Sequence, residues 1–381
     1  MIRLLSLAVL AGFSFQDAGD AASEKAKLHE ELAKAAEKVA DQLLKWKSWD
    51  EARAFLDVVR AKSDARAEAL DKLLAKTEKQ TSGWEWDRRT SELVKEFGKE
   101  RAKKFYAFAR AWKEKDAEAS RWTDAEGEIL DDLLDYLKAY GRLCQVRSQH
   151  GLPKTRFDWK LSVPAVWHAK YIQLYPNDEA EVEGKKGYTP EGKSCESNSI
   201  ANHGKALVRL LEDASQGPFD RIYVLNPGLL RIGIGQAGAS TLASVIDVES
   251  GVGNLGTPTE LASPPDGAID VPLTGTDTFL NIVPGKSLKE LGFPISLILF
   301  NPDSKVREVK TKLTDNNRKE LSHHVSTPEK PALPDEYPNN RNAILIVANA
   351  PLKPNTTYQV TVEFSEKGEP KKRVWSFTTK R

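Results

Sequence analysis

The pattern in this sequence with the clearest chemical meaning is a phosphate-loop string at residues 187–194. Its letters, Gly-Tyr-Thr-Pro-Glu-Gly-Lys-Ser, fit a loop whose backbone N–H groups cradle nucleotide phosphates between a buried strand and a helix. Residues 181–186 are too polar for such a strand, Pro190 lacks an N–H donor, and Glu191 repels anions. The string is therefore not interpreted as a nucleotide site.

Two glycine-rich strings, residues 233–238 and 251–256, match the fingerprint of dinucleotide-binding folds. That fingerprint needs a helix directly after the glycines. Residues 240–248 alternate like a strand instead, and Pro258 closely follows the second string. We interpret both strings as turns in a β-rich stretch, and we expect no cofactor.

The composition is that of an ordinary globular protein, and the charge is balanced. The 381 residues include 56 basic and 55 acidic side chains, for a net charge of +1. A protein whose main partner is nucleic acid needs a local cationic excess, so no nucleic-acid partner is expected. With two cysteines, the chain holds neither a disulfide-rich scaffold nor a cysteine-built zinc site.

The first 22 residues have the layout of a secretory signal peptide. A short cationic start at residues 1–3 precedes an apolar run at residues 4–15, and small polar residues follow. The apolar run is shorter than the ~20 residues that span a bilayer. We expect export to the periplasm, the cell surface or the medium, without a membrane span. A buried N-terminal helix is the alternative interpretation.

Proline and glycine divide the rest of the chain. No proline precedes Pro153, although the chain has 20. Residues 23–127 are rich in Glu and Lys, with apolar side chains at three- and four-residue steps, so they are predicted to form a helical domain. Six tryptophans lie there, and we interpret them as core residues rather than a ligand platform. This region shows no catalytic constellation.

Residues 128–257 are predicted to alternate helices with a β-hairpin whose return strand is residues 242–248. Their motifs, in chain order, are Tyr140 and Arg147, Gly151-Leu152-Pro153, Asp158-Trp159-Lys160-Leu161, Trp167-His168-Ala169-Lys170-Tyr171, Gly187-Tyr188-Thr189-Pro190-Glu191-Gly192, Phe219-Asp220-Arg221, Leu225-Asn226-Pro227 and Arg231-Ile232-Gly233-Ile234-Gly235. This ordered set resembles the CAP superfamily, also called the SCP/pathogenesis-related-1 family, in its divergent bacterial branch. The resemblance implies an α-β-α sandwich around a cleft.

The resemblance also implies where a site would lie. Family members with a complete cleft carry two histidines and two acidic residues able to hold a divalent cation. Here Asp220 stands where one histidine is expected, and residues 177–183 lack the other. The remaining cleft candidates are Glu196, His168 and His203, and His168 is also a plausible packing residue. Without the histidine pair, we expect no zinc-type metal site.

Residues 258–381 begin with a proline-rich stretch and continue as short alternating strands, which predicts a β-sandwich. The strings at residues 351–358 and 375–379 resemble bacterial Ig-like domains of surface proteins. The whole chain is thus expected to be a multidomain α+β protein. It would have an N-terminal helical region, a central CAP-like α-β-α sandwich and a C-terminal all-β Ig-like sandwich.

Three classes of function follow from these expectations. The first is an exported, non-catalytic binding or interaction module, whose envelope or extracellular ligand is a protein, lipid or glycan. The second is a hydrolase of peptide or cell-wall polymer that uses cleft carboxylates such as Glu196 and Asp220, which general acid–base chemistry would require to meet. The third is a purely structural envelope protein. The spacing of the residues does not show that the two carboxylates meet, and we favour the binding module.

A disulfide between Cys144 and Cys195 is a further candidate. Export permits oxidation, and two cysteines allow one intramolecular pairing. Both residues fall in the predicted CAP-like domain. Two buried thiols, which behave as small apolar side chains, are the alternative.

Overall fold

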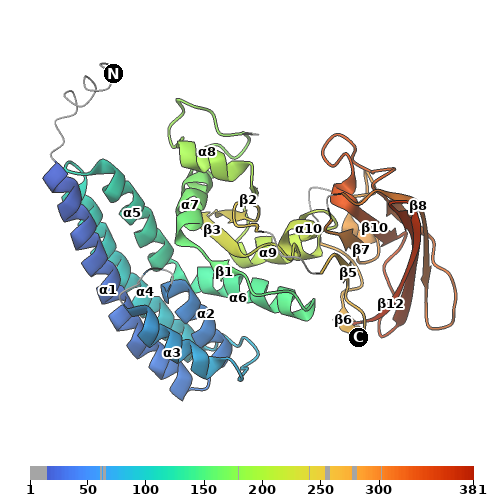
Figure 1. The fold of residues 1–381 in the computed structure, drawn as a ribbon, viewed down its shortest axis with the longest axis horizontal. Helices are drawn as coiled ribbons and strands as arrows, with labels where there is room; N and C mark the ends of the chain where they lie inside the picture. Colours follow the sequence, from blue (N-terminus) through green and yellow to red (C-terminus); the bar gives the residue numbers. More distant parts are fainter. Residues whose placement is uncertain are drawn as a thin grey trace.

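The computed structural model describes residues 15–60, 62, 66–178, 180–239, 241–253, 258–276, 281–301 and 303–381. Over these residues the protein is mixed α/β, with helices at the N-terminal end, a small sheet flanked by helices in the middle, and strands at the C-terminal end (Figure 1). The predicted signal peptide, residues 1–22, lies outside the described residues as far as residue 14. Among the described helices, none is long and apolar enough to cross a membrane.

Six helices make up the N-terminal part described here. They are α1 (Phe15–Lys45), α2 (Trp49–Arg60), α3 (Ala67–Thr77), α4 (Arg88–Trp112), α5 (Ala117–Asp131) and α6 (Leu133–Gln149). The apolar residues at helical spacing are buried, for example Leu32 and Leu43 on α1. Asp87 and Asp116 accept hydrogen bonds from backbone N–H groups in the first turns of α4 and α5, which fixes where these helices begin.

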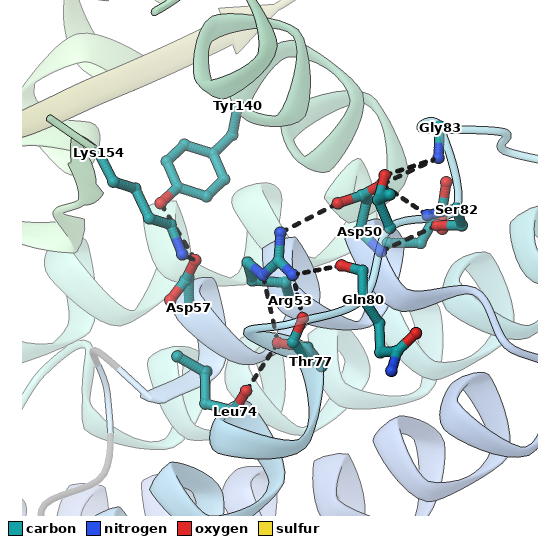
Figure 2. A network of polar contacts seen from close by, with 12 residues as sticks. Asp50, Arg53, Asp57, Leu74, Thr77, Gln80, Ser82, Gly83, Tyr140 and Lys154 are labelled. Atoms are coloured by element: carbon teal, nitrogen blue, oxygen red, sulfur yellow. Dashed lines mark hydrogen bonds and ion pairs between the residues drawn. The ribbon is translucent and has the colours of Figure 1, made fainter. Parts of the chain in front are cut away.

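A polar network holds α2 to its neighbours (Figure 2). The Asp50 carboxylate accepts hydrogen bonds from the loop after α3, at 2.8 Å from Ser82 N and 2.9 Å from Gly83 N. Two turns further along α2, Asp57 forms an ion pair with Lys154 and lies 3.4 Å from the Tyr140 hydroxyl. Burial raises the pKa of Asp57, and Lys154 opposes that effect. The network therefore fixes α2 both to the loop and to the start of the middle part.

The N-terminal helices and the middle part share one apolar core. Trp159, at the start of α7 (Trp159–Leu174), donates a hydrogen bond to Val58 O of α2 at 2.8 Å. The same buried cluster contains residues of α1 to α7, of α9 (Leu207–Gln216) and of the strands β3 (Arg231–Ala237) and β4 (Ala243–Asp247). The predicted boundary between residues 127 and 128 lies inside α5. The division into a helical domain and a CAP-like domain stays a prediction.

The middle sheet has the strand order β1-β3-β4-β2. The strands are β1 (Arg156–Phe157), β2 (Ser199–His203), β3 (Arg231–Ala237) and β4 (Ala243–Asp247). Strand β4 pairs antiparallel with β3 and with β2, and β1 is parallel to β3. The predicted hairpin is therefore confirmed. Strand β2 forms one edge of the sheet, and β1 forms the other.

Residues 233–237 of the first glycine-rich string lie inside β3, and Gly238 alone follows the strand, which corrects the interpretation of the whole string as a turn. A Cβ at Gly235 would stand 2.1 Å from the carbonyl carbon of Ala165, and one at Gly233 would stand 2.6 Å from that of Leu161. Helix α7 thus lies directly on β3, and only a strand without side chains at these positions permits the approach. The glycines pack a helix onto a sheet.

The C-terminal part contains two four-stranded sheets, in the orders β5-β7-β10-β9 and β6-β12-β11-β8. The strands are β5 (Glu260–Ser263), β6 (Ala268–Val271), β7 (Ile295–Leu299), β8 (Val306–Thr314), β9 (His323–Ser326), β10 (Ala343–Ala348), β11 (Thr357–Glu366) and β12 (Glu369–Thr379). One buried cluster draws on both sheets, as in a β-sandwich. Strands β7 and β10 are buried on both faces because their outer face packs against Phe219 and Ile222 of the middle part.

Cys144 and Cys195 are both free thiols, which corrects the disulfide candidate. Cys144, on α6, packs against the main core, whereas Cys195 lies in a separate cluster between α7 and β4. A disulfide requires α-carbons within ~7 Å, and the two helices that carry these residues belong to different packing layers. Burial raises the pKa of Cys144 to about 11, so it remains a thiol at neutral pH.

We therefore expect thiol titration of the denatured, unreduced protein to give two free thiols per chain. The reason is that each sulfur is enclosed by side chains of its own cluster. A titration that finds none in a monomeric protein would show that the two clusters are wrongly placed.

Candidate functional site

Three of the four predicted cleft residues line one cavity of about 450 Å³. His168 comes from α7, Glu196 from α8 (Pro190–Glu196) and His203 from the end of β2. The chain after α7 completes the wall with Tyr175 and Glu181. The cavity thus lies where one end of α7, α8 and the edge of the sheet meet.

A chain of polar contacts holds this wall together. His168 Nδ1 lies 2.7 Å from Glu181 Oε1, and both side chains are almost fully buried. The backbone N–H of Glu181 donates to Glu196 Oε2 at 2.5 Å. Lys193 donates to the other oxygen of Glu196 at 2.8 Å. Histidine, two carboxylates and lysine are therefore linked in one line from α7 to α8.

Residues 187–194, which match the phosphate-loop string, contain the N-cap and the first residues of α8. Thr189 is its N-cap and accepts a hydrogen bond from Gly192 N at 2.9 Å, with Pro190 in the first turn. A Cβ on Gly192 would stand 2.9 Å from Glu181 Oε1. The glycine thus makes room for a carboxylate of the protein itself. A negative charge at this place disfavours a phosphate.

Glu181 is the residue of the site that sequence reasoning missed. The resemblance implies a histidine in residues 177–183, and no periodic pattern marks a buried carboxylate in an irregular segment. Its Oε2 atom is buried and has no hydrogen-bond partner within the described part of the chain. A buried acceptor without a donor is costly. This atom is therefore the group in the cavity most in need of a hydrogen-bond donor.

Asp220 does not join the other candidates. It lines a second cavity of about 230 Å³, together with Tyr223, Glu249 and Tyr337, the last from the C-terminal part. Burial raises the pKa of Asp220 to about 6, against the attraction of Lys205. Across the described residues, its carboxylate has no hydrogen-bond partner. The structure thus places Glu196 and Asp220 in different cavities.

The titration of Asp220 predicts a pH dependence of stability. Between its pKa of ~3.9 in an unfolded chain and about 6 in the fold, the folded protein holds a proton that the unfolded chain has released. The free energy of unfolding then falls as pH rises through this window. We expect Asp220→Asn to gain stability relative to the wild type between pH 4 and pH 7, in urea titrations. Asp303→Asn, at an exposed position, is the control. If the stability difference between Asp220→Asn and the wild type is the same at every pH from 4 to 7, the assignment is wrong.

Metal binding was expected to be absent. Across the residues that the structure describes, no group of three or more His, Cys, Asp or Glu side chains is arranged to hold a metal ion. In particular, Asp220 and the His168 cavity do not form one ligand set. The absence of a zinc-type site remains a prediction.

Comparison with known proteins does not identify the chain. Neither a protein-family model nor a curated protein sequence matches it. The likeness to CAP and Ig-like domains consequently depends on the motifs alone, and function has to be inferred from the geometry of the two cavities.

Proposed function

We propose that this chain is an exported, non-catalytic binding module that holds its ligand in the cavity lined by His168, Glu181, Glu196 and His203. In this proposal the middle part is a divergent CAP-like domain, and the C-terminal part is an Ig-like sandwich. The helical part packs against the middle part and enlarges its core. The ligand is an envelope or extracellular molecule.

The observation that carries the proposal is the state of the carboxylates. Both oxygens of Glu196 are already bonded, one to Lys193 and one to the backbone of Glu181. Glu181 is bonded through one oxygen to His168. Hydrolysis by paired carboxyls needs two such groups placed across a reacting bond. The pair considered from sequence, Glu196 and Asp220, lines two separate cavities, which favours binding over hydrolysis.

The cavity wall suggests what kind of ligand fits. Tyr171 donates its hydroxyl hydrogen to Asp178 at 2.8 Å and accepts from Val182 N at 3.0 Å, so its phenol is already bonded. Glu181 Oε2 remains as a buried acceptor without a partner in the described chain. A ligand that brings an N–H or O–H donor therefore gains the strongest contact.

The test uses the full chain on an array that carries random peptides, cell-wall glycan fragments and phospholipid vesicles. We expect one class to be retained by the wild type and to be recovered chemically unchanged by mass spectrometry. Glu181→Gln and His203→Ala should each weaken that binding, while Glu85→Gln, at an exposed position, should not. His203→Ala covers the case in which Glu181→Gln fails to fold, since His203 is only half-buried.

Two results would contradict the proposal. One is release of a cleaved product from any arrayed polymer. The other is equal binding by the wild type and both cavity variants, which would place the ligand elsewhere.

A further inference from the structure

Strand β2 forms one edge of the middle sheet, and no other strand of the described residues pairs with its outer side. It pairs with β4 alone, and its register joins Asn198 to Val248 and Gly204 to Leu242, through hydrogen bonds of 3.0 and 2.6 Å. In an antiparallel ladder, hydrogen-bonded pairs alternate with non-bonded pairs. Residues 200 and 202 therefore point their N–H and C=O groups to β4, and residues 199, 201 and 203 point theirs outward.

The outward backbone groups are free. Within the described residues, Ser199, Ala201 and His203 make no backbone hydrogen bond through these N–H and C=O groups. All three residues are half-buried rather than covered. An open strand edge of this kind is a template for another strand.

Both cavities lie along this same edge. Residues 197–201 line the cavity of Asp220, residues 201–203 line the cavity of His168, and Ala201 belongs to both. Every residue of β2 thus borders one cavity or the other. A strand laid beside β2 would pass both openings.

Each cavity also holds a carboxylate that forms no direct ion pair with a lysine or arginine among the described residues, although Lys205 attracts Asp220 and Lys193 attracts Glu181 at longer range. In the first, Asp220 has no ion pair among the described residues, whereas Glu249 is paired with Arg341 at 2.7 Å. In the second, Glu181 contacts His168 but no lysine or arginine, and its Oε2 is unpartnered in the described chain. Charge complementarity therefore favours a ligand with basic side chains.

We infer that β2 binds an extended peptide as an added strand, with basic side chains of the peptide reaching the cavities of Asp220 and Glu181. This inference rests on the proposed function and names the class of ligand. The main chain of the peptide would supply affinity through the free groups of Ser199, Ala201 and His203. The side-chain cavities would supply specificity.

The probe is a library of seven-residue peptides, acetylated and amidated, screened with the full chain. The tightest binder is then resynthesised with one N-methyl group at each position in turn. Strand addition predicts an alternating effect: methylation at every second position weakens binding at least about tenfold, the cost of roughly one main-chain hydrogen bond. Methylation at the intervening positions should have little effect. A uniform tolerance of N-methyl groups overturns the inference.

Substitutions in the protein test the same strand edge independently of the peptide. Ala201→Pro removes the outward N–H at the centre of β2 and leaves the hydrogen bonds to β4 in place, so peptide binding should fall. Ala201→Ser keeps that N–H and is the matched control. Asp220→Asn should weaken the preference for a basic residue at one end of the peptide. The N-methyl series keeps the inference testable if Ala201→Pro does not fold.

The outcomes separate this inference from the proposed function. If Glu181→Gln abolishes peptide binding but no N-methyl group matters, or if only a glycan or a lipid binds in the cavity, strand addition is wrong and the binding module stands. If no peptide, glycan or vesicle binds, both are wrong.

Discussion

Replacing Arg221 by methionine is expected to lower the free energy of unfolding by about 3–5 kcal/mol. The side chain is fully buried at the junction of the middle and C-terminal parts. Its guanidinium donates to Pro294 O at 2.7 Å and to Gln216 O at 2.6 Å, and it lies 5.1 Å from the centre of the Phe293 ring. Methionine fills the volume but leaves these carbonyl groups buried without a donor.

Urea unfolding of the full chain measures this loss. Arg231→Met is the matched control, because Arg231 is exposed and forms a surface ion pair with Asp158. Such a pair contributes at most about 1 kcal/mol. Equal stability of the two variants would show that Arg221 does not join the two parts.

Replacing Gly235 by alanine is expected to cost about 3 kcal/mol or to prevent folding. The added Cβ would stand 2.1 Å from Ala165 C and 2.3 Å from Ala165 O, which are backbone atoms of α7 and cannot rotate away. The steric clash with Ala165 can be removed only if α7 moves away from β3. Because α7 carries His168, the variant that does fold should also have an altered cavity.

Thermal unfolding and soluble yield measure the Gly235→Ala effect. Gly151→Ala is the control: its φ of +66° strains an alanine, but no atom lies within 4 Å of the added Cβ. That strain costs only about 1 kcal/mol. If both variants lose the same amount of stability, α7 does not pack against β3 at Gly235 as closely as described.

The helices and strands whose apolar residues recur with a clear period could be predicted from the sequence. Their caps and packing contacts could be predicted only in part. Thr123 has the type of an N-cap, yet it lies inside α5, donates its hydroxyl hydrogen to Ala119 O at 2.7 Å, and leaves the cap to Asp116. The glycines of β3 have the spacing of a turn or a phosphate site. Their role depends on a helix some 70 residues earlier in the chain, a packing contact that local patterns do not contain.

The candidate site was predictable to a similar extent. Motif order led to His168 and Glu196, and His203 was a candidate only as a remaining histidine of the same stretch. The structure brings these three residues together. The same order led to Asp220, which the structure places in the neighbouring cavity. Glu181 could not be found because its importance comes from burial and from an unpartnered oxygen. Those properties arise only when the segment after α7 folds back over α8.

Hydrogen exchange of the backbone amides of β2 tests the central claim most directly. The full chain is measured alone and with the tightest-binding probe of the array. The amides of Ser199, Ala201 and His203 should exchange quickly in the free protein, because no described group accepts from them. Ligand binding in the cavity beside β2 predicts that these amides slow down while the exposed faces of α1 and α4 do not change. Unchanged exchange at residues 197–203, with protection appearing elsewhere, would contradict the account.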